Sequence, residues 1–220
     1  MNGQRQFMAI AIVFLSMEYA YKRKYIKTIL LVSLAIIFHQ SAFLMIPVYI
    51  GIWIFDGKKF YIISAMFLVL IRVGLPYFLN ILSSTSILSY GSKDVERGIK
   101  SARISIPNIF IASVILLTCF LLKKRILSKK ENVFYIKFVW ISLLLFVLLS
   151  NLGSAVTRIC FYFTSVYILL IPDIMKIFNK KVEYIVSRIV LWIVCYGYIY
   201  VLLVNSIATG NDFYPYRSFW

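Results

Sequence analysis

Apolar runs long enough to cross a bilayer fill most of this 220-residue chain, and they limit its fold more than any motif does. Hydrophobic residues make up 62% of the sequence, and the mean hydropathy is +0.88. A bilayer core needs about 20 apolar residues per helix. The sequence therefore predicts an all-α, polytopic integral membrane protein, with about six to eight membrane segments in a single transmembrane domain over residues 1–220.

Charged and polar residues mark the borders of the expected membrane segments. These segments lie at about 5–21, 28–55, 59–79, 104–122, 133–150, 159–175 and 188–208. The run at 28–55 is too long for one ordinary helix, and His39-Gln40-Ser41 and Pro47 interrupt it. We expect this run to be bent or re-entrant, as two half-helices that turn near His39.

Lysine-rich connectors separate the apolar runs and account for most of the net charge of +16. In a soluble protein such a charge would suggest nucleic acid, but lysines in short connectors are typical of cytoplasmic loops. The clusters include Lys22-Arg23-Lys24, Lys58-Lys59, Lys123-Lys124-Arg125, Lys129-Lys130 and Lys180-Lys181. A single crossing at 28–55 would place Lys123–Lys130 outside, whereas a bent pair places every cluster inside. We therefore predict a lipid bilayer around the chain and no nucleic-acid partner.

Most of the cations on the outer face of this predicted topology are arginines, and the lysines there are Lys93 and Lys100. The arginines are Arg5, Arg97, Arg103, Arg158 and Arg217, with Arg72 in the outer half of its span. A guanidinium group binds phosphate oxygens bidentately, so these residues suggest a phosphorylated ligand. Alternatively, the arginines belong to an interfacial belt and extend toward the headgroups.

Residues 83–103 form the one sizeable polar stretch between apolar runs, and we expect an extracytoplasmic loop or an amphipathic helix there. The cysteines, Cys119, Cys160 and Cys195, lie in apolar stretches without metal-ligand spacing, and His39 is the only histidine. Neither a disulfide framework nor a metal site is indicated. We expect no cofactor.

His39 is the ionisable residue in the middle of an apolar run, where such a group is a candidate functional residue. It could act as a general base, since an unperturbed histidine titrates at a pKa of about 6.5. Alternatively, its ring could bond a freed backbone carbonyl and hold the bend closed. Asp212, in a tail that also carries Tyr214 and Tyr216, is the second candidate base, and the two tyrosines are candidate sugar platforms.

Four short motifs appear in a characteristic order: Arg5-Gln6 opening a span, FHQSA at 38–42, NLGSAVTRICFYF at 151–163 and YPY at 214–216. In this order the chain resembles the EpsG-like, Wzy-type polymerases of bacterial surface polysaccharides, whether O-antigen, exopolysaccharide or capsule. The resemblance is to the C-terminal part of such proteins. We therefore expect the chain to be part of a larger polymerase, inactive if truncated.

The resemblance implies a glycosyltransferase that joins undecaprenyl-diphosphate-linked oligosaccharide repeat units at the outer face of the bacterial cytoplasmic membrane. Arg158 would bind the diphosphate, assisted by Arg5 or Arg217, and His39 or Asp212 would serve as the base. The other substrate-binding candidates are Gln6, Arg72, Arg97, Tyr162, Tyr214 and Tyr216. A chain-length regulator and a flippase are the expected protein partners. Three alternatives remain open: a flippase of lipid-linked oligosaccharide, a ligase that moves finished glycan onto lipid A or protein, or a non-catalytic membrane partner of an assembly complex.

Overall fold

Every element that the structure describes is helical. The computed structural model describes residues 2–84, 106–149, 154–176 and, in part, 184–200. The helices are α1 (Asn2–Tyr21), α2 (Tyr25–Phe38), the 3-10 helix η1 (Gln40–Leu44), α3 (Met45–Ile54), α4 (Gly57–Ser84), α6 (Ile106–Leu121), α7 (Lys123–Ile126), α8 (Lys130–Leu149), α9 (Ser154–Thr164) and α10 (Tyr167–Met175). The prediction of an all-α fold is confirmed for these residues. The chain divides into two compact units, Met1–Ile171 and Pro172–Trp220.

Two helical stretches are long and apolar enough, by length and composition, to cross a membrane. They are Lys130–Leu149, which is α8, and Arg158–Met175, which runs from α9 into α10. Among the described residues, the shorter apolar helices are Tyr25–Phe38, Gln40–Ile54 and Ile106–Leu121. All of them overlap the apolar runs that the sequence predicts as membrane segments, and three begin one to three residues before the predicted run.

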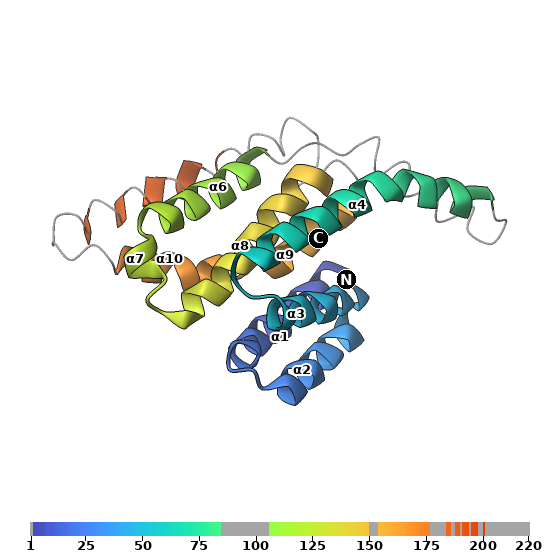
Figure 1. Cartoon of the computed structure of the whole chain (residues 1–220), viewed down its shortest axis with the longest axis horizontal. Coiled ribbons are helices and arrows are strands. Elements are labelled where there is room, and N and C mark those ends of the chain that lie inside the picture. The colour runs from blue at the N-terminus through green and yellow to red at the C-terminus, as the bar shows by residue number, and fades with distance from the viewer. Residues whose placement is uncertain are drawn as a thin grey trace, which may run out of the picture. The chain divides into compact units, whose positions relative to one another are not determined.

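α8 is the central helix of the first unit. It packs against α4, α6 and α9, and Figure 1 shows it running alongside α4 and α6. Residues 134–139 are buried without interruption, so neighbouring helices cover α8 on all its faces over this stretch. A helix that is apolar all round is expected at the centre of a bundle.

Small and medium-sized side chains allow α1 and α2 to pack closely. Ala9, Val13 and Ala20 on α1 are fully or almost fully buried, as are Val32 and Ala35 on α2. The two helices are extensively in contact, and they lie side by side with α3 in Figure 1. Small residues at helical spacing let helix backbones approach one another, which is common at helix interfaces in membranes.

The chain bends at the position predicted from the sequence. α2 ends at Phe38, His39 has extended backbone angles (φ −153°, ψ 117°), and η1 follows. Backbone hydrogen bonds close the bend, from His39 N to Ala35 O at 2.9 Å and from Ala42 N to His39 O at 3.0 Å. α2, with 14 residues, is about 21 Å long, which is less than the hydrocarbon thickness of about 30 Å.

The distant ends of α2 and α3 meet again, so the two helices form a hairpin. The rings of Tyr25 and Trp53 lie 4.7 Å apart between centroids and nearly perpendicular. Trp53 Nε1 donates to the Ala20 carbonyl at 3.1 Å, and Arg23 lies 3.9 Å from Asp56. The connectors before α2 and after α3 are therefore at the same end of the first unit, as the bent-pair prediction requires.

Left-handed backbone at two residues makes the turns on either side of this hairpin. Gly57, at φ 55°, ends the hairpin before α4, and Arg23, at φ 53°, turns the chain from α1 into α2. Glycine adopts this conformation freely. Arg23 adopts it at some energetic cost, and the backbone hydrogen bonds from Arg23 N to Ala20 O and from Lys24 N to Tyr19 O support the turn.

Candidate functional site

Three motifs that are distant in the sequence meet where α1 begins, α2 ends and α9 runs. Gln6 in α1 is 5% exposed, and its Nε2 donates to the backbone carbonyl of Arg158 in α9 at 2.8 Å. The Arg5-Gln6 motif is thus fixed to the Arg158 motif across 152 residues of sequence. A buried amide that is satisfied in this way specifies one register between two helices.

The third motif joins through Ser41 in η1. Its hydroxyl lies 3.1 Å from the hydroxyl of Tyr162 in α9, and either can be the donor. Tyr162 is 1% exposed, so in this structure its ring packs against protein. A role as a sugar platform would need an exposed ring face, and Tyr162 instead connects the His39 bend to α9.

His39 lies at this junction and is half-buried. Within the described part of the chain, its imidazole makes no hydrogen bond. The bend is closed by backbone hydrogen bonds of His39 and Ala42 and by the Ser41 hydroxyl. These groups hold the bend closed, which is one of the two roles that the sequence suggested for the His39 imidazole. The imidazole is therefore not needed for that purpose.

Three of the predicted arginines lie in the helices that form the junction or the cavity beside it. Arg5 and Arg158 are exposed, and Arg72 is half-buried in α4. Arg5 directly precedes Gln6, whose amide is bonded to the Arg158 backbone, so the two arginines start from adjoining segments of α1 and α9. Neither Arg5 nor Arg158 has an ion-pair partner among the described residues. Two cations without a carboxylate form a suitable place for an anionic ligand.

An apolar cavity of about 500 Å³ lies in the first unit between η1, α3, α4, α8 and α9. Its lining residues are Leu44, Pro47, Val48, Gly51, Phe55, Phe60, Ile63, Ser64, Phe67, Leu68, Ile71, Ile141, Leu145, Leu149, Ile159 and Phe163. The only polar side chain among them, Ser64, is already engaged, because it accepts from Trp140 Nε1 at 3.2 Å and donates to the Tyr61 carbonyl at 3.1 Å. The cavity therefore offers apolar contact and leaves few polar groups for water.

The cavity extends from the hairpin base toward the arginines. Phe55 and Phe60 flank the short connector between α3 and α4. Leu44, at the end of η1, lies 11 residues before Phe55, and Ile71 in α4 lies 11 residues after Phe60. Eleven residues of α-helix span about 16 Å. At that far end, Arg72 follows the lining residue Ile71, and Arg158 precedes the lining residue Ile159. Apolar space and cationic groups are thus adjacent in one region.

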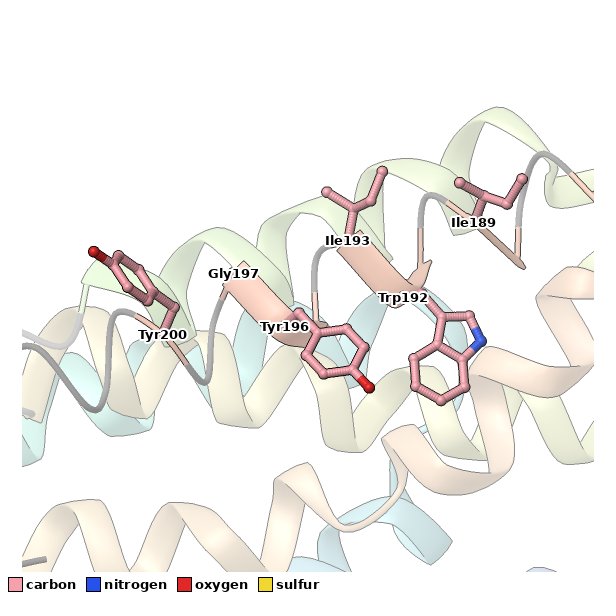
Figure 2. Close-up of a pocket in the computed structure, with 6 residues that line it drawn as sticks. All are labelled: Ile189, Trp192, Ile193, Tyr196, Gly197 and Tyr200. Atoms are coloured by element: carbon pink, nitrogen blue, oxygen red, sulfur yellow. The ribbon is translucent and has the colours of Figure 1, made fainter.

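A second hollow lies in the second unit, on a short stretch of helix. It measures about 580 Å³ and is lined by Ile189, Trp192, Ile193, Tyr196, Gly197 and Tyr200. In Figure 2 the rings of Trp192 and Tyr196 project from one side of the ribbon and Ile193 from the other. The two rings stack at 5.4 Å. None of the described residues that line this hollow is a cation, so these residues offer less to an anionic ligand than the junction in the first unit.

Several predicted site residues lie outside the described residues. They are Asp212, Tyr214, Tyr216, Arg217 and Arg97, together with residues 85–103 of the predicted loop. Within the described part of the chain, no three His, Cys, Asp or Glu side chains come together as metal ligands. The sequence analysis did not single out Lys137, a buried lysine within an apolar run, or the residues that line the cavity.

The chain matches the EpsG family over residues 1–218, which is nearly its whole length. No curated protein and no solved structure matches the chain. The match covers all four motifs that suggested the resemblance, including the three that meet in the first unit. The chain therefore belongs to the EpsG family, a family of Wzy-like polymerases.

Proposed function

We propose that this protein polymerises oligosaccharide repeat units carried on undecaprenyl diphosphate, at the outer face of the bacterial cytoplasmic membrane. The observation that carries this proposal is the junction of α1, η1 and α9 next to an apolar cavity. A lipid-linked substrate has an apolar tail, a diphosphate and a sugar, in that order. The first unit offers an apolar cavity whose lining includes neighbours in sequence of Arg72 and Arg158 and a residue of η1, directly after the His39 bend.

The diphosphate is the leaving group, and it requires positive charge. Arg158 and Arg5 are the proposed ligands of its oxygens, assisted by Arg72, which follows the cavity-lining residue Ile71. Preorganised donors that stabilise developing charge usually provide the largest single contribution to catalysis. Of the residues outside the described part of the chain, Arg97 and Arg217 are proposed to assist.

The acceptor sugar needs a base. In the proposed reaction, the acceptor hydroxyl oxygen attacks the anomeric carbon of the donor, the bond from that carbon to the diphosphate oxygen breaks, and the hydroxyl proton moves to His39. The imidazole of His39 is suited to this because it makes no hydrogen bond within the described residues and sits half-buried beside Arg158's helix. Asp212 remains the second candidate base, with Tyr214 and Tyr216 as proposed sugar contacts.

The cavity is the proposed site of the first isoprene units of the lipid. Its volume of about 500 Å³ lies within the range of about 300–1,000 Å³ that is usual for small-molecule sites. The proposed topology has six to eight membrane segments, with the α2–α3 hairpin entering and leaving on the cytoplasmic side. This orientation keeps the connectors at Lys22–Lys24 and Lys58–Lys59 inside.

Complementation tests this proposal. A strain that lacks its own polymerase, supplied with the wild-type chain and with any upstream part of its reading frame, is expected to regain a ladder of glycan chain lengths on a gel. Arg158→Lys should abolish the ladder at equal membrane abundance, because lysine keeps the charge and loses the bidentate fork. Arg125→Lys, an exposed substitution in the basic α7 segment, is the matched control and should leave the ladder intact.

Two other outcomes would replace the proposal. The same cavity and cations would suit a lipid-linked oligosaccharide flippase, and a flippase defect would leave repeat units on the cytoplasmic side instead of unpolymerised units outside. A non-catalytic partner of the assembly complex would tolerate Arg158→Lys without any change in the ladder. Either result would overturn the polymerase assignment.

A further inference from the structure

Lys137 is an exception among the lysines of this protein. The other described lysines are exposed, as expected for residues in connectors and at helix ends. Lys137 lies on the central helix α8 and is 5% exposed. A buried ammonium inside a helical membrane bundle is costly, so its contacts should reveal what it does there.

Its ammonium group binds the end of α3. Nζ donates to the carbonyl of Ile52 at 3.3 Å and to the carbonyl of Phe55 at 3.2 Å. α3 ends at Ile54, with Phe55 as its C-terminal cap residue, so both carbonyls belong to the group that has no partner inside the helix. A cation at this point also interacts favourably with the negative end of the helix dipole.

The same ammonium contacts the start of α4. It lies 4.9 Å from the centroid of the Phe60 ring, which is within the range of a cation–π contact. Lys137 therefore connects three elements at once: the end of α3, the start of α4 and the middle of α8. Phe55 and Phe60 are also the lining residues at this end of the apolar cavity.

The opposite end of α3 carries the His39 bend. α3 and η1 together contain 15 residues, so a shift of the helix at its Lys137 end is transmitted to Ser41 and His39. Among the described residues, one side-chain hydrogen bond joins the bend to α9, between the hydroxyls of Ser41 and Tyr162. Its position therefore depends on how α3 is anchored elsewhere.

We propose that Lys137 is a positioning residue that fixes α3 along its axis and so places the His39 bend against α9. Its functional consequence rests on the proposed polymerase activity, but its structural consequence does not. Replacing Lys137 should loosen the bend although the substitution is at the other end of α3. An exposed lysine on the same helix, Lys130, provides the matched control.

Hydrogen exchange of the full-length protein, followed by mass spectrometry, measures the structural consequence. In Lys137→Met, the amides of residues 39–45 should exchange roughly tenfold faster or more, because hydrogen bonds from a charged donor are lost. Lys137→Arg keeps charged donors and should restore slower exchange, with Lys137→Gln intermediate. Lys130→Met should leave these amides unchanged.

If Lys137→Met unfolds globally, exchange will rise in α6 as well, and the Arg and Gln variants then decide. Exchange at the bend that does not follow the order Met, Gln, Arg, wild type would overturn the proposal. Faster exchange confined to residues 52–57 would also overturn it, because Lys137 would then only cap α3.

Activity provides the second readout. In a polymerisation assay with a lipid-linked repeat unit, a positioning role predicts that Lys137→Met lowers kcat while substrate affinity stays within about twofold of wild type. A fall in affinity with unchanged kcat would contradict the positioning role. If the wild-type protein makes no polymer, the proposed function fails, and the exchange measurement still decides on Lys137.

Discussion

The two ends of the α2–α3 hairpin are built very differently. At the base, Trp53 donates to α1, Tyr25 packs on Trp53, and Lys137 binds the last carbonyls of α3. At the bend, the described residues are held by backbone hydrogen bonds, the Ser41–Tyr162 hydrogen bond and the burial of Ala42 and Met45. A charged donor and an indole thus secure the base, whereas the bend is secured by hydroxyl groups and apolar packing. Polar segments on a rigid scaffold are where binding and catalytic groups often lie.

Of the substitutions that compare the base with the bend, filling the cavity between them is expected to have the largest effect on activity. A Cβ added at Gly51 meets no atom within 4 Å, so Gly51→Leu should fit and should favour the helix by about 0.8–1.0 kcal/mol. The leucine side chain would displace about as many methylene groups of the ligand as it has carbon atoms. Each displaced methylene costs about 0.8 kcal/mol, and together they correspond to roughly a hundredfold loss of affinity. We expect thermal stability to be kept or raised and polymerisation to fall.

Gly74→Leu is the control for that substitution. Gly74 also has open space around its Cβ position, but it does not line the cavity. Polymerisation by Gly74→Leu should match the wild type. If both leucine variants keep wild-type chain lengths, the cavity is not the lipid site.

A pair of tyrosine substitutions compares the stability contributed by the middle of α3 with that contributed by the bend. Tyr49 in α3 is fully buried, and its hydroxyl lies 2.7 Å from the hydroxyl of Ser16 in α1. Tyr49→Phe should lower the free energy of unfolding by about 1–1.5 kcal/mol, because a buried hydrogen bond is lost. Tyr162→Phe should cost only about 0.5 kcal/mol, since its partner Ser41 is partly accessible to solvent.

Thermal unfolding in detergent, monitored at several protein concentrations, measures this difference. Equal losses would show that the bend is held as firmly as the rest of α3. A larger loss for Tyr162→Phe would reverse the comparison and place the structural anchor of the hairpin at α9.

The smallest effect is expected at the surface of the base. Arg23 and Asp56 lie 3.9 Å apart with 60% and 79% of their side chains exposed. Exposed ion pairs contribute about 0–1 kcal/mol. Asp56→Asn should therefore shift stability by less than about 0.5 kcal/mol, and the shift should vanish in high salt. A change that persists in high salt would mean that Asp56 has another partner.

The bend could be predicted from the sequence because three independent signals coincide at residues 38–47. The apolar run is too long, His39, Gln40 and Ser41 are polar, and Pro47 restricts the start of a new helix. The charge of the connectors then required a return to the same side. The structure confirms the bend and the hairpin, with Tyr25 and Trp53 in contact, and the side of the membrane on which the hairpin begins and ends stays a prediction.

The partners within the junction could not be predicted in the same way. Nothing near Ser41 in the sequence indicates that its hydroxyl meets Tyr162, which lies 121 residues away. Tyr162 looked like a surface aromatic because it follows Arg158, yet tertiary packing buries it. The contacts of Lys137 could not be predicted either, because a lone lysine in an apolar run does not indicate which backbone carbonyls it will bind.

The shortness of the hairpin has a consequence for the membrane itself. α2 spans about 21 Å, and η1 with α3 spans about 25 Å, against about 30 Å of hydrocarbon. In the proposed topology, the helices of this hairpin are shorter than the hydrocarbon core of the lipids beside them. Such mismatch is relieved by thinning of the bilayer. A glycan and its lipid carrier would then meet in a local depression of the outer leaflet, where the reacting sugars stay in water and the isoprenoid tail stays in oil.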